Sequence, residues 1–271
     1  MATDTQAIEQ VATGAPPNAI EHYIEFRNVY KSYDHPVLTD VSFYVDPGQT
    51  LAIIGRSGVG KSVTLSHMMG FQRPNSGRVI VAYTDITNLP EAELRAIRRK
   101  VTMVFQSGAL FDSLTVGENI LFSLELREDY NEQNREDVVD GLLGMVDLGH
   151  VKNLYPSDLS TGYKRAVAIA RALAAQPECI LYDEPTTMVD PIMSDDLGNL
   201  MLRLKRQLGL TAVVVTHDLD LMRKVADSVM FLYQGEAIYF GPTSELEKCQ
   251  HPHVKQFLAM DRVEIAGPIE E

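Results

Sequence analysis

The sequence has few cysteines, fewer basic than acidic residues and no long apolar run, and each shortage excludes a class of protein. Cys179 and Cys249 are the only two cysteines, they lie far apart, and they match no metal or redox spacing. This favours a reducing, intracellular setting. The 24 basic against 37 acidic residues give a net charge of −13, which argues against nucleic acid as a partner.

No apolar run reaches the roughly 18 residues that a bilayer-spanning helix needs. The N-terminal residues 1–20 are polar, carry acidic rather than basic residues early and end near two prolines. They do not match a signal peptide, and we expect a flexible extension there. The chain length of 271 residues suits one large α/β domain or two small ones. A role at a membrane would therefore need a partner that holds the chain there.

The clearest motif is a phosphate-binding loop between a strand and a helix. Residues 22–54 alternate apolar and polar positions around a turn, which predicts strands. The run LAII at 51–54 suits a strand buried on both faces. It leads directly into GRSGVGKS at 55–62, a full match to the P-loop pattern. The segment KSVTLSHMMG then predicts a helix whose N-terminus faces the phosphates.

The residue types of this loop suit its chemistry. Glycines let backbone N–H groups converge on phosphate oxygens. Lys61 is expected to bridge the β- and γ-phosphates, and the Ser62 hydroxyl to hold Mg²⁺. A glycine-rich turn that fits the pattern by chance is the alternative. The strand before the loop and the helix after it favour phosphate binding.

Two further strands end in side chains that suit hydrolysis. CILYDEP places Asp183 and Glu184 at the carboxyl end of a predicted buried strand, where ligands bind in open α/β sheets. We expect Asp183 to contact Mg²⁺ and Glu184 to polarise the attacking water. His217 ends the strand TAVVVTH in the same manner. A lone histidine is usually structural, but this placement favours a role at the γ-phosphate.

The middle of the chain is mostly helical. The basic run in EAELRAIRRK (91–100) is interpreted as the solvated face of a helix, and VTMVFQ predicts a short strand ending at Gln106. Residues 118–155 predict an inserted helical region. In LSTGY, Ser160 is well placed as the N-cap of the next helix. A capped helix start is the plain interpretation, but its position between the P-loop and Asp183 favours an anion site.

This ordered set of motifs resembles the nucleotide-binding subunit of an ATP-binding cassette (ABC) transporter, over about residues 22–245. The resemblance implies an α/β fold, a P-loop NTPase (RecA-like) core with a helical ABC subdomain. The core would comprise about 21–90 and 160–245, and the helical subdomain about 91–159. A C-terminal tail at 246–271 would follow, with a possible dimer contact.

The resemblance also implies an ATPase with ATP and Mg²⁺ as cofactors. Glu184 and His217 would be catalytic, and Ser62, Gln106 and Asp183 would face the metal. The implied nucleotide contacts comprise the adenine-stacking Tyr33, the Walker A loop of Gly55, Arg56, Ser57, Gly58, Val59, Gly60, Lys61, Ser62 and Val63, the Q-loop Gln106, Ser160, Gly162 and Tyr163 of the signature motif, and Asp190 of the D-loop.

In this family two subunits clasp two ATP molecules head to tail, which implies a homodimer. Three departures from the family pattern bear on the clasp. Thr161 and Tyr163 replace a glycine and a glutamine of the usual signature Leu-Ser-Gly-Gly-Gln. Because a β-branched residue tolerates positive φ poorly, we expect a displaced turn and a weaker clasp. Val63 replaces a common threonine, and the D-loop reads Thr-Met-Val-Asp. The retained Lys61, Glu184 and His217 still imply turnover.

A finer resemblance concerns the cargo. FQSGALFDSLTVGEN, KRAVAIARAL and HPHVKQFL are similar to the ATPases of MCE and Mla lipid-transport systems. This implies two integral-membrane permease subunits, an MCE-domain lipid-binding protein, and a peripheral position on the cytoplasmic face of the inner membrane. The alternative is the ATPase of an amino-acid or other small-solute importer, since such proteins also fill this loop with apolar residues. The single cassette and the negative charge disfavour a soluble, non-transport ABC ATPase.

Overall fold

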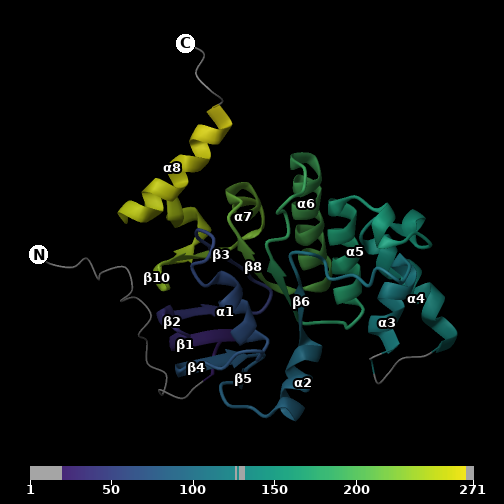
Figure 1. The fold of residues 1–271 in the computed structure, drawn as a ribbon, viewed down its shortest axis with the longest axis horizontal. Helices are drawn as coiled ribbons and strands as arrows, with labels where there is room; N and C mark the ends of the chain where they lie inside the picture. Colours follow the sequence, from purple (N-terminus) through teal and green to yellow (C-terminus); the bar gives the residue numbers. More distant parts are fainter. Residues whose placement is uncertain (1–19, 126, 128–131, 267–271) are drawn as a thin grey trace, which may run out of the picture.

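Two β-sheets and a set of flanking helices carry the fold in the computed structural model, which describes residues 20–125, 127 and 132–266 (Figure 1). The strands are β1 (Ile24–Ser32), β2 (Pro36–Val45), β3 (Thr50–Ile54), β4 (Ser76–Val81), β5 (Thr84–Asp85), β6 (Val101–Val104), β7 (Cys179–Asp183), β8 (Thr211–Thr216), β9 (Ser228–Tyr233) and β10 (Glu236–Pro242). The α-helices are α1 (Lys61–Met68), α2 (Glu91–Lys100), α3 (Val116–Glu125), α4 (Arg135–Met145), α5 (Thr161–Leu173), α6 (Pro191–Leu208), α7 (Leu219–Val225) and α8 (Pro252–Ala266).

The larger sheet has the strand order β10-β9-β3-β8-β7-β6, and all neighbours are parallel except β10 and β9. Every residue of β3 and β8 is buried. A parallel strand covered by helices on both faces needs such a continuous apolar run, and this confirms the strands expected from the sequence. The carboxyl ends of β3, β7 and β8 consequently meet at one edge of the sheet.

The smaller sheet is antiparallel, with the order β2-β1-β4-β5. Its inner face packs on α1 and on the larger sheet through a group of buried side chains. In this group Phe26 and Phe43 stack with their ring centres 4.5 Å apart. Residues 22–54 therefore form the strands that their alternating pattern predicts. Helix α2 buries Leu94 and Ile97 in the same group of side chains, while most of its basic run is exposed.

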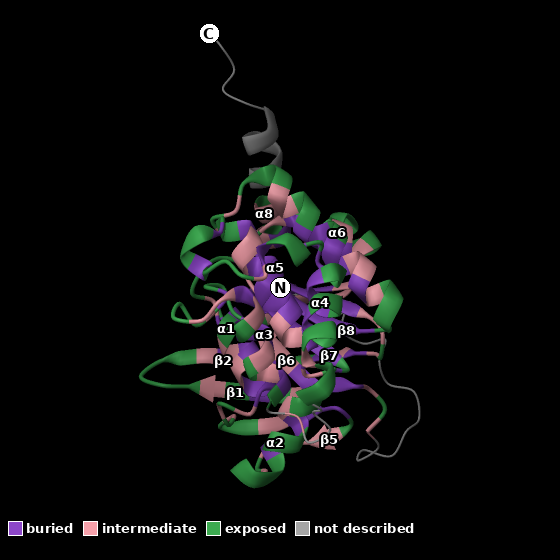
Figure 2. Cartoon of the chain, turned by 90° about the vertical axis from the view of Figure 1, so that its right-hand side faces the viewer, coloured by how far each residue is buried: buried purple, intermediate pink, exposed green. Residues whose placement is uncertain are grey.

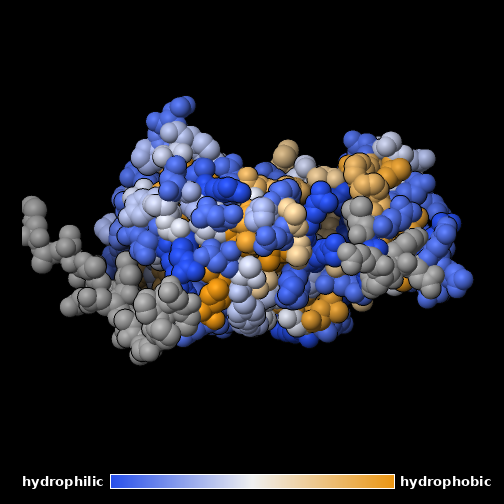
Figure 3. Space-filling model, turned by 90° about the horizontal axis from the view of Figure 1, so that it is seen from below, coloured by the Kyte–Doolittle hydropathy of each residue, from blue (hydrophilic) through white to orange (hydrophobic). Residues whose placement is uncertain are grey.

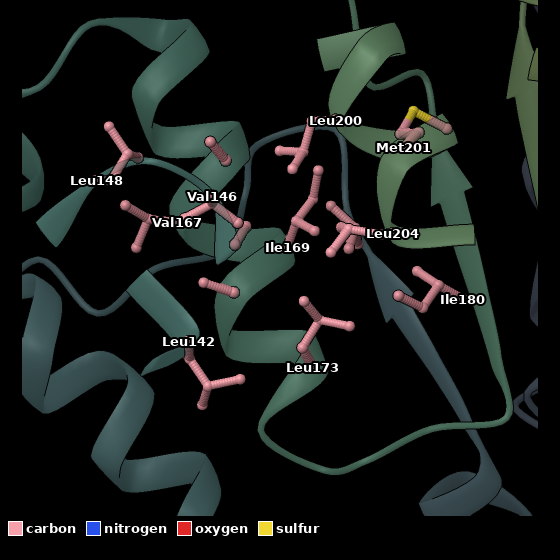
Figure 4. Close-up of a cluster of buried hydrophobic side chains, with 14 of the residues drawn as sticks. Leu142, Val146, Leu148, Val167, Ile169, Leu173, Ile180, Leu200, Met201 and Leu204 are labelled. Carbon is pink, nitrogen blue, oxygen red and sulfur yellow. The ribbon is translucent and has the colours of Figure 1, made fainter. Parts of the chain in front are cut away.

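The helical region lies at the other end of the molecule, where α3, α4 and α5 pack together (Figure 1). Figure 4 shows how α5 joins them to the core, with Val167, Ile169 and Leu173 facing side chains of α4, α6 and β7. Strand β6 pairs with β7 in the larger sheet. The expected helical stretch at 91–159 therefore contains one strand of the core.

The C-terminal helix α8 packs by one side on the core. Val254 and Leu258 are buried against Leu219 and Met222 of α7. The 1–19 part of the expected N-terminal extension and the last five residues of the tail lie outside the described residues.

Burial follows the sheets. In Figure 2 the buried residues line the sheets and the inner sides of the helices, while the outer sides are exposed. On the face drawn in Figure 3, apolar residues form small groups separated by hydrophilic ones. Within the described ranges, no helix combines the length and the apolar character that crossing a membrane requires.

Candidate functional site

The loop between β3 and α1 is shaped by glycines at two close approaches. Gly55 has φ +149°, and a Cβ there would lie 2.3 Å from the carbonyl oxygen of Leu232. Gly60, with φ +109°, caps α1, and its Cβ would lie 2.9 Å from the Leu38 side chain. No other residue fits these positions without displacing neighbouring strands. The backbone can therefore curl over the N-terminus of α1, where partial positive charge favours anions.

Lys61 is buried at the first position of α1. Its ammonium group donates to the carbonyl oxygen of Gly55 at 2.7 Å and to that of Arg56 at 3.2 Å. It also lies 3.3 Å from Oε1 of Glu184. A buried ammonium group needs such oxygens, because leaving it unpaired is costly. The lysine is thus held at the mouth of the loop, where phosphate oxygens would enter.

The carboxyl ends of β7 and β8 bring the acidic and histidine side chains to the same place. The Ser62 hydroxyl donates to Oδ1 of Asp183 at 3.1 Å. Burial raises the pKa of the Asp183 carboxyl, and the neighbouring Glu184 raises it further, whereas the Ser62 hydrogen bond lowers it. Oε2 of Glu184 lies 2.8 Å from Nδ1 of His217 and accepts from the Thr187 hydroxyl at 3.2 Å.

Lys61, Ser62, Glu184 and His217 line one cavity of about 1000 Å³, and Asp183 lies behind its wall, bonded to Ser62. Of the residues predicted from the sequence, its wall contains Tyr33, Arg56, Ser57, Gly58, Gly60, Lys61, Ser62, Val63, Gln106, Glu184 and His217. Tyr33 stands at the exposed rim, 52% accessible, and its hydroxyl donates to Oε1 of Gln72 at 2.7 Å. A volume of this size suits a ligand as large as a nucleotide. Lysine, serine and two carboxylates at one end can bind a phosphate chain and orient a water against it.

The signature and D-loop residues lie apart from this wall. Ser160 caps α5 by accepting from the backbone N–H of Tyr163 at 3.2 Å, and Asp190 caps α6 by accepting from Met193 at 3.0 Å. Gly162 packs against Met193, since a Cβ there would lie 2.0 Å from its Cγ. Within one chain these residues do not meet the P-loop, so their predicted contact with a nucleotide requires a second subunit.

The displaced turn expected at Thr161 assumed a positive φ, which Thr161 does not have, and the weaker clasp stays a prediction. Thr161 is the first residue of α5 and is absent from the described residues with positive φ. The physical reason is that Ser160 takes the extended N-cap conformation, with φ −62° and ψ 160°, so that helical geometry begins at Thr161. A β-branched side chain is acceptable at that position.

Some wall residues escape sequence reasoning. Val37, Thr187, Leu219 and Phe257 line the same cavity, although the sequence motifs assign none of them to the site. Thr187 had a detectable signal, because it follows Glu184 by three residues in a turn. Phe257 had none: it comes from α8 and reaches the site only through packing, with its ring edge-on to Phe231 at 5.0 Å.

Comparison with known sequences identifies a family and related proteins, methionine import ATPases among them. The family described as ABC transporter matches residues 38–187. The methionine import ATP-binding protein MetN 2 of Rhodococcus jostii is 37% identical over 242 residues, which are 87% of this chain and 71% of that protein. The methionine import protein MetN of Bifidobacterium longum is 39% identical over 224 residues, or 81% of this chain and 55% of that protein.

Solved structures resemble the fold over most of its length. A dimeric ATP-binding cassette, in a post-hydrolysis state bound to ADP and Pi, has a TM-score of 0.74 and 32% identity, covering 81% of this chain and 98% of its own. The structure of cbiO1 from Clostridium perfringens, part of the ABC transporter complex cbiONQ, has a TM-score of 0.78 and 26% identity. It covers 89% of this chain and 97% of its own.

Proposed function

This chain belongs to the ABC transporter family and is the ATP-hydrolysing subunit of a transporter, and we propose that it drives the import of an amino acid through a membrane permease. The observation that carries this proposal is the set of methionine import ATPases among its relatives, 37% and 39% identical to it. These names favour the amino-acid alternative over the lipid-transport function expected from the sequence. The chain would then sit on the cytoplasmic face of the membrane, held by two permease subunits.

The proposed mechanism assigns one task to each group at the cavity. Lys61 binds the β- and γ-phosphates, and Glu184 polarises the attacking water, which its position beside Lys61 and His217 supports. Tyr33 stacks on adenine from the exposed rim. His217 contacts the γ-phosphate from the end of β8. Two copies of the chain would clasp two ATP molecules, each supplying Ser160, Gly162, Tyr163 and Asp190 to the nucleotide of the other.

Mg²⁺ fits the oxygens present at this end of the cavity. Ser62 and Asp183 already lie within hydrogen-bonding distance of each other, and both offer the hard oxygen atoms that this ion prefers. Mg²⁺ is commonly bound by one or two carboxylates together with substrate phosphates. It therefore does not need a cluster of three acidic or histidine side chains, and no such cluster occurs in the described parts of the chain. When bound, the ion would neutralise phosphate charge, and Gln106, which lines the same cavity, is a further residue that would contact it.

Lipid transport with an MCE-domain protein is the second candidate, and it rests on the sequence resemblance of one surface segment. The segment SGALF at 107–111 leaves Phe111 exposed beside Phe122, with both rings 42% accessible and their centres 4.8 Å apart. An exposed aromatic pair on the helical region suits contact with an apolar partner. Its sequence context is the one that resembles lipid-transport ATPases.

Purification of the tagged protein from its native membranes in mild detergent distinguishes the candidates. We expect a permease together with a solute-binding protein, and uptake of labelled methionine when the complex is reconstituted in liposomes. Recovery of an MCE-domain protein, with transfer of a fluorescent phospholipid, would replace the amino acid by lipid. Recovery of no membrane protein would refute the transport proposal.

A further inference from the structure

The loop between β6 and α3 faces the nucleotide cavity at one end and solvent at the other. Gln106 lines the cavity. Two residues later the chain reverses at Gly108 and Ala109, which have φ +77° and +47°. Beyond this turn Phe111 is exposed. The left-handed turn therefore separates a nucleotide-facing residue from an apolar, solvent-facing tip.

Arg171 of α5 binds this turn through two adjacent carbonyl groups. Its guanidinium donates to the carbonyl oxygen of Ala109 at 2.7 Å and to that of Gly108 at 3.0 Å. Arg171 is half-buried, and burial lowers its pKa. A guanidinium partly removed from water is stabilised by such bonds, and the planar fork restrains both carbonyl groups at once. A lysine would offer one point charge in place of the fork.

Packing attaches the same turn to α5 independently of the arginine. Gly108 is buried, and a Cβ there would lie 3.4 Å from the carbonyl oxygen of Lys164 and 3.7 Å from Cβ of Ala168. Leu110 packs on the hydrophobic cluster of the helical region. The loop turn at 108–110 thus packs on the N-terminal half of α5, and Arg171, near the C-terminal end of that helix, donates hydrogen bonds to it.

The far end of the loop is held by a buried amide. Oδ1 of Asn119, on α3, accepts from the backbone N–H of Phe111 at 2.8 Å. Its Nδ2 donates to the carbonyl oxygens of Phe111, Leu114 and Thr115, at 3.1, 3.1 and 2.9 Å. Asn119 is fully buried. The hydrogen bonds described here therefore hold the exposed tip to α3 on one side and to α5 on the other. Both helices belong to the helical region.

We propose that Arg171 is a positioning residue that makes the turn at 108–110 and helix α5 move as one unit. Ser160 caps the N-terminus of that same helix. A membrane partner that displaces the exposed tip then displaces Ser160, the residue assigned to the nucleotide of the second subunit. The inference rests on the proposed function, because it assumes a partner at the tip. Gln106, on the other side of the turn, stays with the cavity.

Coupling between two sites is reciprocal, so clasping of ATP at Ser160 must also affect the tip. This is measurable without the permease, in the Glu184→Gln background that is expected to trap the ATP dimer. Hydrogen exchange at the amides of 109–113 is compared with and without ATP. We expect ATP to slow this exchange at least about tenfold when Arg171 is present, which corresponds to 1.4 kcal/mol. Absence of any ATP effect at 109–113 would overturn the inference.

Arg171→Met is expected to abolish the ATP effect at 109–113 while ATP still protects the start of α5. Arg171→Lys is expected to retain part of it, and serves where the methionine variant folds poorly. Arg203→Met is the matched control, because Arg203 donates to the carbonyl oxygen of Met145 at 2.9 Å, far from the loop. Equal effects in the Arg171 and Arg203 variants would show a general loss of stability and would contradict the inference.

The purified transporter complex separates this inference from the proposed function. Stimulation of ATP hydrolysis by the permease is expected to fall at least about tenfold in Arg171→Met and to persist in Arg203→Met, with 1.4 kcal/mol again the corresponding free energy. If the wild-type complex shows no stimulation, the proposed function fails. If the wild type is stimulated and Arg171→Met is stimulated equally, the inference alone fails.

Discussion

At the scale of single residues, the Glu184 carboxylate is shared between two nitrogen groups. Oε1 lies 3.3 Å from the Lys61 ammonium group, and Oε2 lies 2.8 Å from Nδ1 of His217. The left-handed backbone of Glu184, with φ +49°, turns the chain away from β7 directly after Asp183. Backbone strain of this kind is commonly found at functional sites. The carboxylate is therefore held in place before any water arrives.

Replacing Glu184 by glutamine is expected to lower the rate of ATP hydrolysis by at least about 100-fold, because the amide cannot act as a general base. ATP should still bind, since Lys61 is retained. Phosphate release measures the first effect, and nucleotide retained on the purified protein measures the second. Glu93→Gln, at an exposed position on α2, is the control. An unchanged rate in Glu184→Gln would refute its role.

His67 makes the stability of the fold depend on pH. It is buried on α1, with Nδ1 2.7 Å from the Val63 carbonyl oxygen. Burial lowers its pKa, and the charge of Lys31 adds to this, although the Val63 bond raises it. Above pH of about 6.5 both the folded and unfolded states hold a neutral imidazole. As the pH falls below that value, the unfolded state takes up the proton first, so the folded state loses stability.

The expected loss is up to about 1.4 kcal/mol per pH unit between pH of about 6.5 and the lowered pKa of His67. Urea unfolding at pH 7.5 and 5.5 measures it. His67→Gln keeps a donor for the Val63 carbonyl group but has no proton to gain, so its stability should fall less with pH. His150→Gln, at an exposed position, should behave as the wild type. Parallel curves for all three proteins would contradict the assignment.

The residues that the sequence alone locates share one property. Glu184 and His217 directly follow buried strands, and Lys61 ends the glycine-rich loop that follows β3. Prediction of these strands therefore also places the three side chains at one edge of the sheet. Arg171 donates to backbone carbonyl groups, and Phe257 reaches the cavity through its packing on Phe231. Neither contact has a sequence pattern from which it could be predicted. The φ of Thr161 could not be predicted for another reason. It depends on the N-cap conformation of Ser160, which a comparison of residue types with the family motif does not reveal.

At the scale of elements, α5 and α6 are in tight contact where Gly162 meets Met193. Alanine at position 162 would place its Cβ 2.0 Å from Cγ of Met193, so one helix or the side chain must move. The expected cost in the free energy of unfolding is about 1–3 kcal/mol, as for other overpacked sites. Chemical unfolding measures it, and Gly141→Ala on α4, with nothing within 4 Å, should not destabilise the protein.

The double variant Gly162→Ala/Met193→Ala tests the cause. Removing the methionine side chain frees the space, so the double variant should be more stable than the sum of the single changes by about 1 kcal/mol or more. Strict additivity would mean that the glycine is required for another reason, such as access of a ligand to the start of α5. The same unfolding experiment decides between these two outcomes.

Elements with one strong pattern are predictable, and elements defined by their partners are not. Strands β3, β7 and β8 are mostly apolar and are buried over nearly their whole length because both faces of their sheet are covered. Strand β6, four residues long, has no pattern that assigns it to the core rather than to the helical region. Its place is decided by pairing with β7, which lies far along the chain. The sequence therefore predicts the strand itself but not the sheet to which it belongs.

At the scale of the whole molecule, α8 has two separable parts. The tail for which a dimer contact is expected, 246–271, includes Val254 and Leu258, which are buried in the core, and continues beyond them. Deletion of 250–271 should therefore cost several kcal/mol of stability, because burial of a valine or leucine is worth about 1.5–3 kcal/mol each. Thermal unfolding should show a markedly lower Tm. Loss of the dimer in that deletion would say nothing about a dimer contact.

A chain that ends at Ala259 keeps both buried side chains and tests the contact itself. Its Tm should stay close to that of the full chain, while ATP-dependent dimerisation in the Glu184→Gln background should weaken. Light scattering after size-exclusion chromatography measures the dimer, and the full chain with Glu184→Gln is the reference. A dimer of undiminished stability would remove the tail from the interface.

The contacts of the Lys61 ammonium group bear on how phosphate binds and leaves. The group is surrounded by oxygen atoms of Gly55, Arg56 and Glu184, so a phosphate that binds there exchanges with these partners. The net free energy of such an exchange is small compared with the gross strength of each bond. The same oxygens take the ammonium group back when the phosphate departs. The P-loop can therefore keep its conformation between the release of one nucleotide and the binding of the next.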